Sequence, residues 1–215
     1  MRMRKLKHLA DRQQRCVPVW VQEPMTMAGH WRELMPQAEA LWLEIGCGKG
    51  KFTAETAQAN PGVLLLGMER VEEAHVMAME KAMEKQLTNA RYLILDAEWL
   101  DKCFAPGELD RIYINFCDPW PSSRHARRRL THHDFLERYV RALAPGGSIH
   151  FKTDNRDLFD FSIQELETTG WVVSNVTYDL HKDGIVGTMT GYEEKFHAEG
   201  IPICRLEATP GQRVI

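Results

Sequence analysis

The sequence predicts an α/β fold in which a mostly parallel β-sheet is covered by helices on both faces. From residue 41 onwards, short apolar runs alternate with longer amphipathic runs, the pattern of strands and helices in alternation. Turn-forming sequences separate the runs, for example Asn60-Pro61-Gly62 and Ala144-Pro145-Gly146-Gly147. Because successive parallel strands are joined by long crossover connections, this alternation favours a parallel sheet.

Seven segments are expected to be strands: 41–45, 63–68, 92–95, 111–116, 148–153, 171–180 and 201–207. Helices are expected to end at Asn60, to span 71–87, to open at Thr131 and to span 157–169. Asp134 stands three residues after Thr131, the spacing of a capping box. The last two strands have no clear helix between them, so we expect an antiparallel pair at the sheet edge.

Length and composition indicate one globular domain. A chain of 215 residues can bury a full hydrophobic core, and 44% apolar and 27% charged residues are an ordinary globular balance. We expect residues 1–30 to be a flexible basic extension and residues 31–215 to form a single domain. The protein is expected to be a monomer or a homodimer.

The sequence favours a soluble, cytoplasmic protein. No apolar run approaches the ~20 residues of a membrane helix, and the basic start lacks the apolar stretch of a secretory signal. The five cysteines show no C-x-x-C pairing, which favours buried or free thiols over disulfides or a zinc site. No metal is expected, because the nine histidines are scattered. The pair His132-His133 is expected to begin a helix.

Charge is unevenly distributed along the chain. The net charge of −3 alone argues against a nucleic-acid binder. However, residues 1–15 hold six basic residues against one acid, and four arginines lie within 124–129. Two local basic patches are what a phosphate-contacting face would show. The alternative is a solvated surface loop and a disordered tail.

A glycine loop follows the first expected strand, as Glu44-Ile-Gly46-Cys-Gly48-Lys-Gly50. Glycines at alternate positions allow a tight turn and close approach of a ligand. The spacing is not the G-x-G-x-x-G of dinucleotide loops, which seat a pyrophosphate on a helix N-terminus. The second strand ends at Glu69, where a carboxylate can hold two ribose hydroxyls. The third ends at Asp96, placed to grip an adenine edge.

Together these features resemble the Class I S-adenosylmethionine-dependent methyltransferases. This resemblance implies a Rossmann-like three-layer sandwich with a mostly parallel seven-stranded sheet and an antiparallel edge pair. The cofactor is a sulfonium cation without phosphate, so acids can line its pocket. The competing interpretation, a nicotinamide oxidoreductase, would require the longer glycine pattern.

A second motif follows the fourth expected strand, at residues 118–130. It reads Asp118-Pro-Trp-Pro and continues with the basic cluster of 124–129. This motif resembles the tRNA (guanine-N7)-methyltransferase family. The resemblance extends to His150-Phe-Lys-Thr-Asp154-Asn155 and to Thr190-Gly-Tyr-Glu193-Glu-Lys195-Phe196, and it spans nearly the whole chain.

The resemblance implies methyl transfer from S-adenosylmethionine to N7 of a guanosine in the tRNA variable loop, with Asp118 as the catalytic residue. Cofactor contacts are implied for Glu44, Gly46, Gly48, Gly50, Glu69, Arg70, Asp96, Ala97 and Asp118. Contacts to the guanine or the RNA are implied for Ser122, Arg124, His125, Arg127, Arg128, Arg129, Asp154, Thr190, Gly191, Tyr192 and Glu193.

Two departures from the family pattern concern RNA binding. Ser122 and Ser123 stand where the family usually has at least one lysine, and Gly191 stands where it often has glutamate. They lend weight to an alternative, a non-catalytic tRNA-binding subunit that retains the fold. A third interpretation, methylation of adenine or cytosine amines, is disfavoured by the single proline before Trp120. Trp120 either stacks on RNA or packs its loop, and His125 either contacts RNA or makes a loop hydrogen bond.

Overall fold

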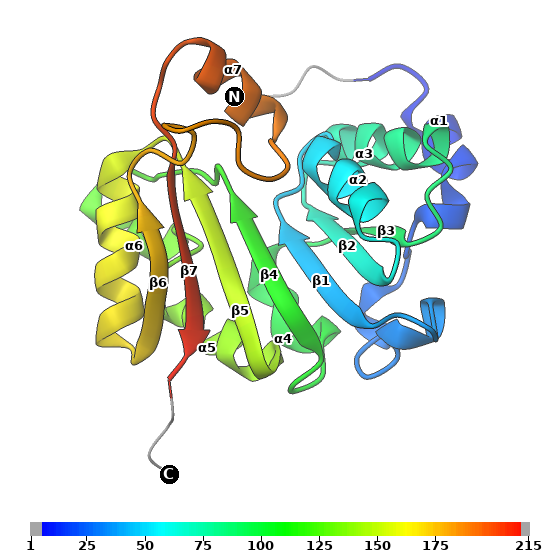
Figure 1. Ribbon diagram of the computed structural model, residues 1–215. Helices are drawn as coiled ribbons and strands as arrows, with labels where there is room; N and C mark the ends of the chain where they lie inside the picture. Colours follow the sequence, from blue (N-terminus) through cyan, green and yellow to red (C-terminus); the bar gives the residue numbers. More distant parts are fainter. Residues whose placement is uncertain (1–5, 212–215) are drawn as a thin grey trace. The chain divides into compact units, whose positions relative to one another are not determined.

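The computed structural model describes residues 6–211, and the chain divides between Ala105 and Pro106 into two units (Figure 1). In the first unit, the parallel strands β1 (Ala40–Ile45), β2 (Val63–Glu69) and β3 (Ala90–Ile94) lie in the order β3-β2-β1. All seven residues of β2 are buried, which requires cover on both faces of the strand.

Two helices connect these strands. Helix α2 (Lys51–Ala59) joins β1 to β2, and α3 (Glu72–Glu84) joins β2 to β3. Both pack on β2 and β3 and on each other, so the first unit has the alternation that the sequence predicted. Shorter elements follow β3, namely η4 (Ala97–Trp99) and α4 (Leu100–Cys103).

The segment before β1, which includes most of the predicted basic extension, packs on this unit. It contains α1 (Leu9–Arg15), η1 (Val17–Val19), η2 (Pro24–Thr26) and η3 (Trp31–Leu34). The Arg12 guanidinium donates to both carboxylate oxygens of Glu80 on α3, at 2.7 and 2.5 Å. Cys16 and Val19 are buried. Long-range contacts of this kind leave no local signature in the sequence. Residues 1–5 lie outside the described residues.

The second unit holds β4 (Leu109–Asn115), β5 (Leu143–Thr153), β6 (Trp171–Thr177) and β7 (Cys204–Pro210), in the order β4-β5-β7-β6. Strands β4 and β5 are parallel, whereas β7 runs antiparallel to both β5 and β6. The expected antiparallel edge pair is therefore confirmed. Helices α5 (His133–Ala142) and α6 (Arg156–Thr168) pack against each other, and α6 covers β5, β6 and β7.

Three local expectations were wrong. A helix, α7 (Gly191–Ala198), lies between β6 and β7, where none was expected; Figure 1 shows it at the end of this unit toward which β4 and β5 point. The N-cap of α5 is His132 rather than Thr131, because the buried Thr131 hydroxyl is 2.7 Å from Ser162 Oγ on α6. In addition, β5 begins at Leu143, ahead of the expected start at 148.

No helix within residues 6–211 is both long enough and apolar enough to cross a lipid bilayer.

Candidate functional site

The glycine loop after β1 is held by the main chain of β2. The N–H groups of Gly46 and Cys47 donate to the Met68 carbonyl at 2.8 and 2.9 Å. Gly50 has φ +70°, and a Cβ there would lie 2.6 Å from Ala78 Cβ on α3. Only glycine allows this approach. Gly46 and Gly48 also have positive φ, but a Cβ on either would meet nothing within 4 Å. The loop therefore borders open space.

Glu69 ends β2 and is oriented by three backbone donors. Its Oε2 accepts from Gly48 N–H at 2.9 Å, and its Oε1 accepts from Arg70 and Val71 N–H at 2.9 Å each. A carboxylate offers about four acceptor positions, so roughly one remains. The hydrogen bonds tie the glycine loop to the end of β2 and fix the direction of this carboxylate.

Glu44 and Asp96, the other two acids predicted to contact the cofactor, lie at the same edge of the first unit as Glu69. The register pairs Glu44 with Gly67 and Glu69 with Ile94, so the carboxyl ends of β1, β2 and β3 are side by side. Glu44 is buried and accepts from the Thr53 hydroxyl. Asp96 accepts from Glu98 N–H at 3.1 Å, and its other oxygen is 3.5 Å from the exposed Arg70 guanidinium. Ala97, next to Asp96, is buried.

In the second unit, Asp118 and Asp154 follow neighbouring parallel strands. The register pairs Asn115 of β4 with Lys152 of β5, so the two exposed carboxylates come from the same edge of this unit. Phe116 and Trp120 flank Asp118 and have φ of +52° and +41°. Positive φ is unfavourable for bulky residues, at about 1–3 kcal/mol each. Surrounding contacts must therefore hold this turn.

Arg129 supplies such contacts. Its Nε donates to the carbonyls of Pro119 and Trp120 at 3.1 and 3.3 Å, and its Nη2 donates to Trp120 O at 3.0 Å. The guanidinium also lies 4.2 Å from the centroid of the Phe161 ring on α6. Arg128 covers the Trp120 ring at 4.8 Å, and the His125 ring meets Trp120 edge-on. The Trp120 ring thus packs within its own loop, and the His125 ring contacts it.

The four arginines of 124–129 therefore differ in solvent exposure and in the groups they contact. Residues 123–128 form the 3₁₀ helix η5 (Ser123–Arg128), preceded by the partly buried Ser122. Arg124, Arg127 and Arg128 are exposed, and the Arg127 side chain retains 84% of its accessible surface. Arg129 alone among these four is half-buried. Three of the arginines are available to a polyanion, whereas Arg129 binds its own chain.

The segment 190–193 begins α7 and is held by a buried carboxylate. Thr190 and Glu193 form a capping box, in which Glu193 N–H donates to Thr190 Oγ1 at 3.0 Å and Thr190 N–H donates to Glu193 Oε2 at 3.1 Å. The same carboxylate, 0% exposed, accepts from Lys152 Nζ at 2.6 Å and lies 2.9 Å from His181 Nε2. Gly191 opens the helix, and Tyr192 is exposed.

Sequence reasoning did not identify Lys152 and His181 as part of this network. Lys152 stood within the segment that carried the family resemblance, but His181 had no local signal. His181 Nδ1 accepts from Val186 N–H at 3.2 Å, which leaves Nε2 as the donor to Glu193. The ring thus ties the loop after β6 to α7.

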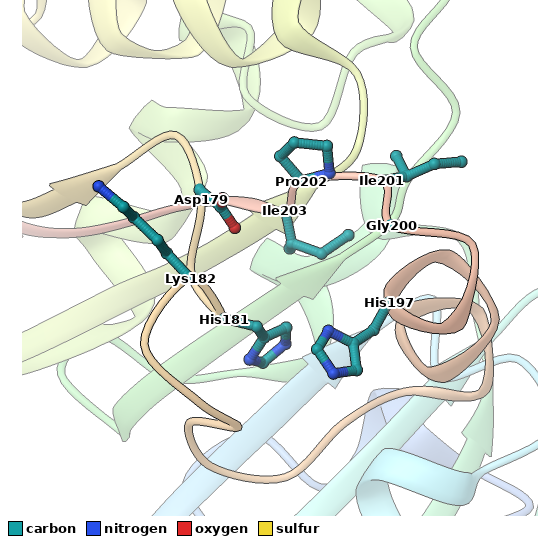
Figure 2. A pocket seen from close by; sticks show the side chains of 8 residues that line it. All are labelled: Asp179, His181, Lys182, His197, Gly200, Ile201, Pro202 and Ile203. Atoms are coloured by element: carbon teal, nitrogen blue, oxygen red, sulfur yellow. The ribbon is translucent and has the colours of Figure 1, made fainter.

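His181 also borders a small cavity (Figure 2). The cavity has a volume of about 160 Å³, and the rings of His181 and His197 face it with centroids 5.1 Å apart. Ligand pockets usually enclose ~300–1,000 Å³. This cavity is therefore too small to be the site of a nucleoside.

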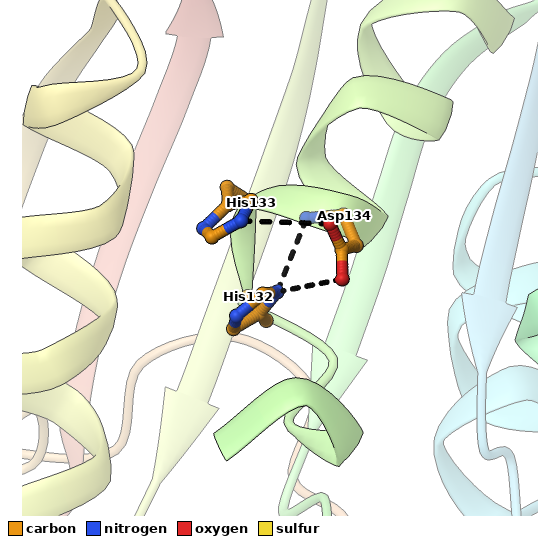
Figure 3. Close-up of side chains that lie close together, drawn as sticks. All are labelled: His132, His133 and Asp134. Carbon is orange, nitrogen blue, oxygen red and sulfur yellow. Dashed lines mark hydrogen bonds and ion pairs between the residues drawn. The ribbon is translucent and has the colours of Figure 1, made fainter.

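The histidine pair at residues 132–133 begins α5, as expected (Figure 3). His132 Nδ1 accepts from Asp134 N–H at 3.2 Å and lies 3.4 Å from Asp134 Oδ2, whereas His133 Nε2 lies 3.5 Å from Oδ1. These three residues have the spacing of metal ligands. However, His132 Nδ1 is engaged as a helix cap, and Arg127 lies 4.0 Å from the carboxylate. With the positive end of the helix dipole adjacent, the cluster suits capping better than a cation.

The cysteine beside Asp118 is not a nucleophile. Desolvation and the charge of Asp118 raise the pKa of Cys117 to about 12, so its thiol is protonated at neutral pH. All five cysteines are free thiols, and four of them are buried, in line with the sequence.

Comparisons with known proteins assign the class and then the family. Residues 38–206 match the model of the family described as "Putative methyltransferase". A solved 16S rRNA methyltransferase, KamB, superposes with a TM-score of 0.66 at 17% identity, covering 86% of this chain and 94% of that one. The protein thus has the methyltransferase fold, and the predicted fold class is confirmed.

Similarity to two relatives identifies the family within the methyltransferases. A tRNA (guanine-N(7)-)-methyltransferase of Listeria monocytogenes serotype 4b (strain F2365) is 42% identical over 97% of this chain and 98% of its own length. One of Geobacillus kaustophilus (strain HTA426) is 46% identical over 87% of each chain. The chain belongs to the tRNA (guanine-N(7)-)-methyltransferase family.

Proposed function

We propose that this protein transfers a methyl group from S-adenosylmethionine to N7 of a guanosine in the tRNA variable loop. The observation that carries the proposal is 42% identity, over 97% of the chain, to a relative named as a tRNA (guanine-N(7)-)-methyltransferase. The proposal places the reaction in the cytoplasm, with tRNA as the partner.

The first unit has the groups that this cofactor requires. S-adenosylmethionine, when bound, supplies the methyl group from a positively charged sulfur. The open space at Gly46 and Gly48 leaves room above the loop. Glu69 retains about one acceptor position for a ribose hydroxyl, and Asp96 with Ala97 is available to an adenine edge. The negative charges of Glu44, Glu69 and Asp96 match a cationic ligand better than the pyrophosphate of a dinucleotide.

The second unit has the groups that guanine requires. N7 is an in-plane lone pair without a proton, so its methylation needs no general base. The purine becomes cationic, and a fixed carboxylate stabilises that charge once bound tRNA excludes water from the site. Asp118 and Asp154 accept from N1–H and N2–H, which adenine does not offer. We expect the base to leave its stack to reach them, because positioning against the methyl group provides much of the rate.

Contacts from 190–193 to the guanine are better assigned to Tyr192 than to Glu193. Tyr192 has 62% of its surface exposed, whereas both oxygens of Glu193 are engaged within the protein. In this proposal Thr190 and Glu193 set the position of α7. The exposed Arg124, Arg127 and Arg128 bind phosphates and thereby orient the tRNA.

The test is transfer of labelled methyl from S-adenosylmethionine to bulk tRNA, with nucleoside analysis of the product. We expect label in 7-methylguanosine, lost by at least about 100-fold in Asp118→Asn. Glu137→Gln, an exposed acid on α5, is the matched control and should be unaffected. Cofactor binding without any labelled nucleoside would instead support the non-catalytic tRNA-binding subunit.

A further inference from the structure

We infer that Arg129 is a positioning residue that sets the spacing between the carboxylates of Asp118 and Asp154. It does not contact the RNA. The inference rests on the proposed function, because it assigns a role within that site. It begins from the difference in exposure within the arginine cluster: Arg129 is half-buried, whereas Arg124, Arg127 and Arg128 are exposed.

The contacts of Arg129 go to the main chain of the turn that follows Asp118. The Trp120 carbonyl receives two hydrogen bonds from one guanidinium, at 3.3 Å from Nε and 3.0 Å from Nη2. Trp120 has φ +41°, a conformation that persists only when its surroundings enforce it. A planar guanidinium fork provides two directed donors, which a lysine ammonium does not reproduce.

The Arg129 guanidinium also contacts the helix that starts beside Asp154. Arg129 lies 4.2 Å from the Phe161 ring centroid, and Phe161 belongs to α6, whose N-cap is Asn155. Asn155 directly follows Asp154. Arg129 therefore connects the turn that carries Asp118 to the helix that fixes Asp154. Loss of this link would change the spacing of two carboxylates that must meet one base.

The variant Arg129→Lys distinguishes the contribution of the guanidinium geometry from that of the positive charge. Arg129→Lys keeps the positive charge but removes the fork, so we expect kcat to fall roughly 10- to 100-fold. The salt dependence of tRNA binding should stay unchanged. Arg127→Ala should instead raise KM for tRNA and lower the slope of log K against log salt by about 0.7–0.9. Arg141→Lys, on the exposed face of α5, is the conservative control and should change neither.

A readout independent of catalysis completes the test. Hydrogen exchange of a peptide covering 116–124 should become faster in Arg129→Lys and remain unchanged in Arg141→Lys. Wild-type kcat in Arg129→Lys with unchanged exchange would overturn the inference, as would a reduced salt slope in Arg129→Ala equal to that of Arg127→Ala. If the wild type transfers no methyl, the proposed function fails, whereas faster exchange in Arg129→Lys would still support the bracing of the turn.

Discussion

The two units hold carboxylates of the candidate site by different means. In the first, Glu69 is oriented by the N–H groups of three residues, and Asp96 accepts from a backbone N–H. In the second, long side chains set the geometry: Arg129 braces the Asp118 turn, and Lys152 and His181 hold the acid of α7. Backbone donors survive side-chain replacement. A single substitution should therefore disturb the second unit more, unless it changes the backbone itself.

The largest effect is expected from Glu193→Ala. The side chains of Glu193 and Lys152 are 0% and 10% exposed, and removal of one partner of a buried ion pair costs about 3–5 kcal/mol. Urea denaturation monitored by circular dichroism measures this loss. The double variant Lys152→Met/Glu193→Leu should recover part of it, because no buried charge remains. A loss below about 1 kcal/mol for Glu193→Ala would remove the contrast between the units.

The next-largest loss of stability is expected from a substitution that strains the backbone of the first unit. Gly50→Ala combines positive φ with a Cβ 2.6 Å from Ala78, so we expect a loss of about 2–4 kcal/mol. Gly48→Ala also has positive φ but meets nothing within 4 Å, and should cost about 1–2 kcal/mol. The same denaturation experiment compares them. Equal losses would show that the approach to α3 is not what requires glycine at 50.

The last prediction concerns acid sensitivity in the core of the first unit, and its full size appears only below neutral pH. Burial lowers the pKa of His75 from 6.5 to about 4, so between these pH values the unfolded chain binds a proton that the folded chain does not. The free energy of unfolding should therefore fall as the pH drops from 6.5 to 4, by at most about 3 kcal/mol.

The variant His75→Leu isolates this group. The difference in the free energy of unfolding between wild type and variant, measured at several pH values, should be constant above pH 6.5 and change below it. A pH-independent difference would mean that His75 does not titrate in this way. His75 packs edge-on against Trp20 and Tyr92, so its protonation would also loosen the segment before β1.

The sequence predicted much of the fold and the residues at the strand ends. Apolar runs and acids that directly follow them are local signals, and Glu44, Glu69 and Asp96 stand where they were expected. Helix α7 was missed although Thr190-x-x-Glu193 has the spacing of a capping box. The helix has only eight residues, too few for a clear amphipathic pattern.

The roles of the individual arginines could not be predicted. Arg127 and Arg129 stand two positions apart in the same basic run, and only the folded chain turns one to solvent and the other to the Trp120 carbonyl. The same holds for His181, which meets Glu193 through a loop, and for Arg12, which pairs with Glu80 over 68 positions. Such pairings are set by tertiary structure, not by sequence spacing.

Chemical modification of the buried cysteine thiols can report when each unit unfolds locally. Cys16, Cys47 and Cys103 lie in the first unit and Cys204 in the second, and burial raises the pKa of all four. In the native state they are shielded and protonated, so a thiol reagent modifies them only when their surroundings open. Mapping the order of modification by mass spectrometry would therefore show which unit opens first, without any engineered label.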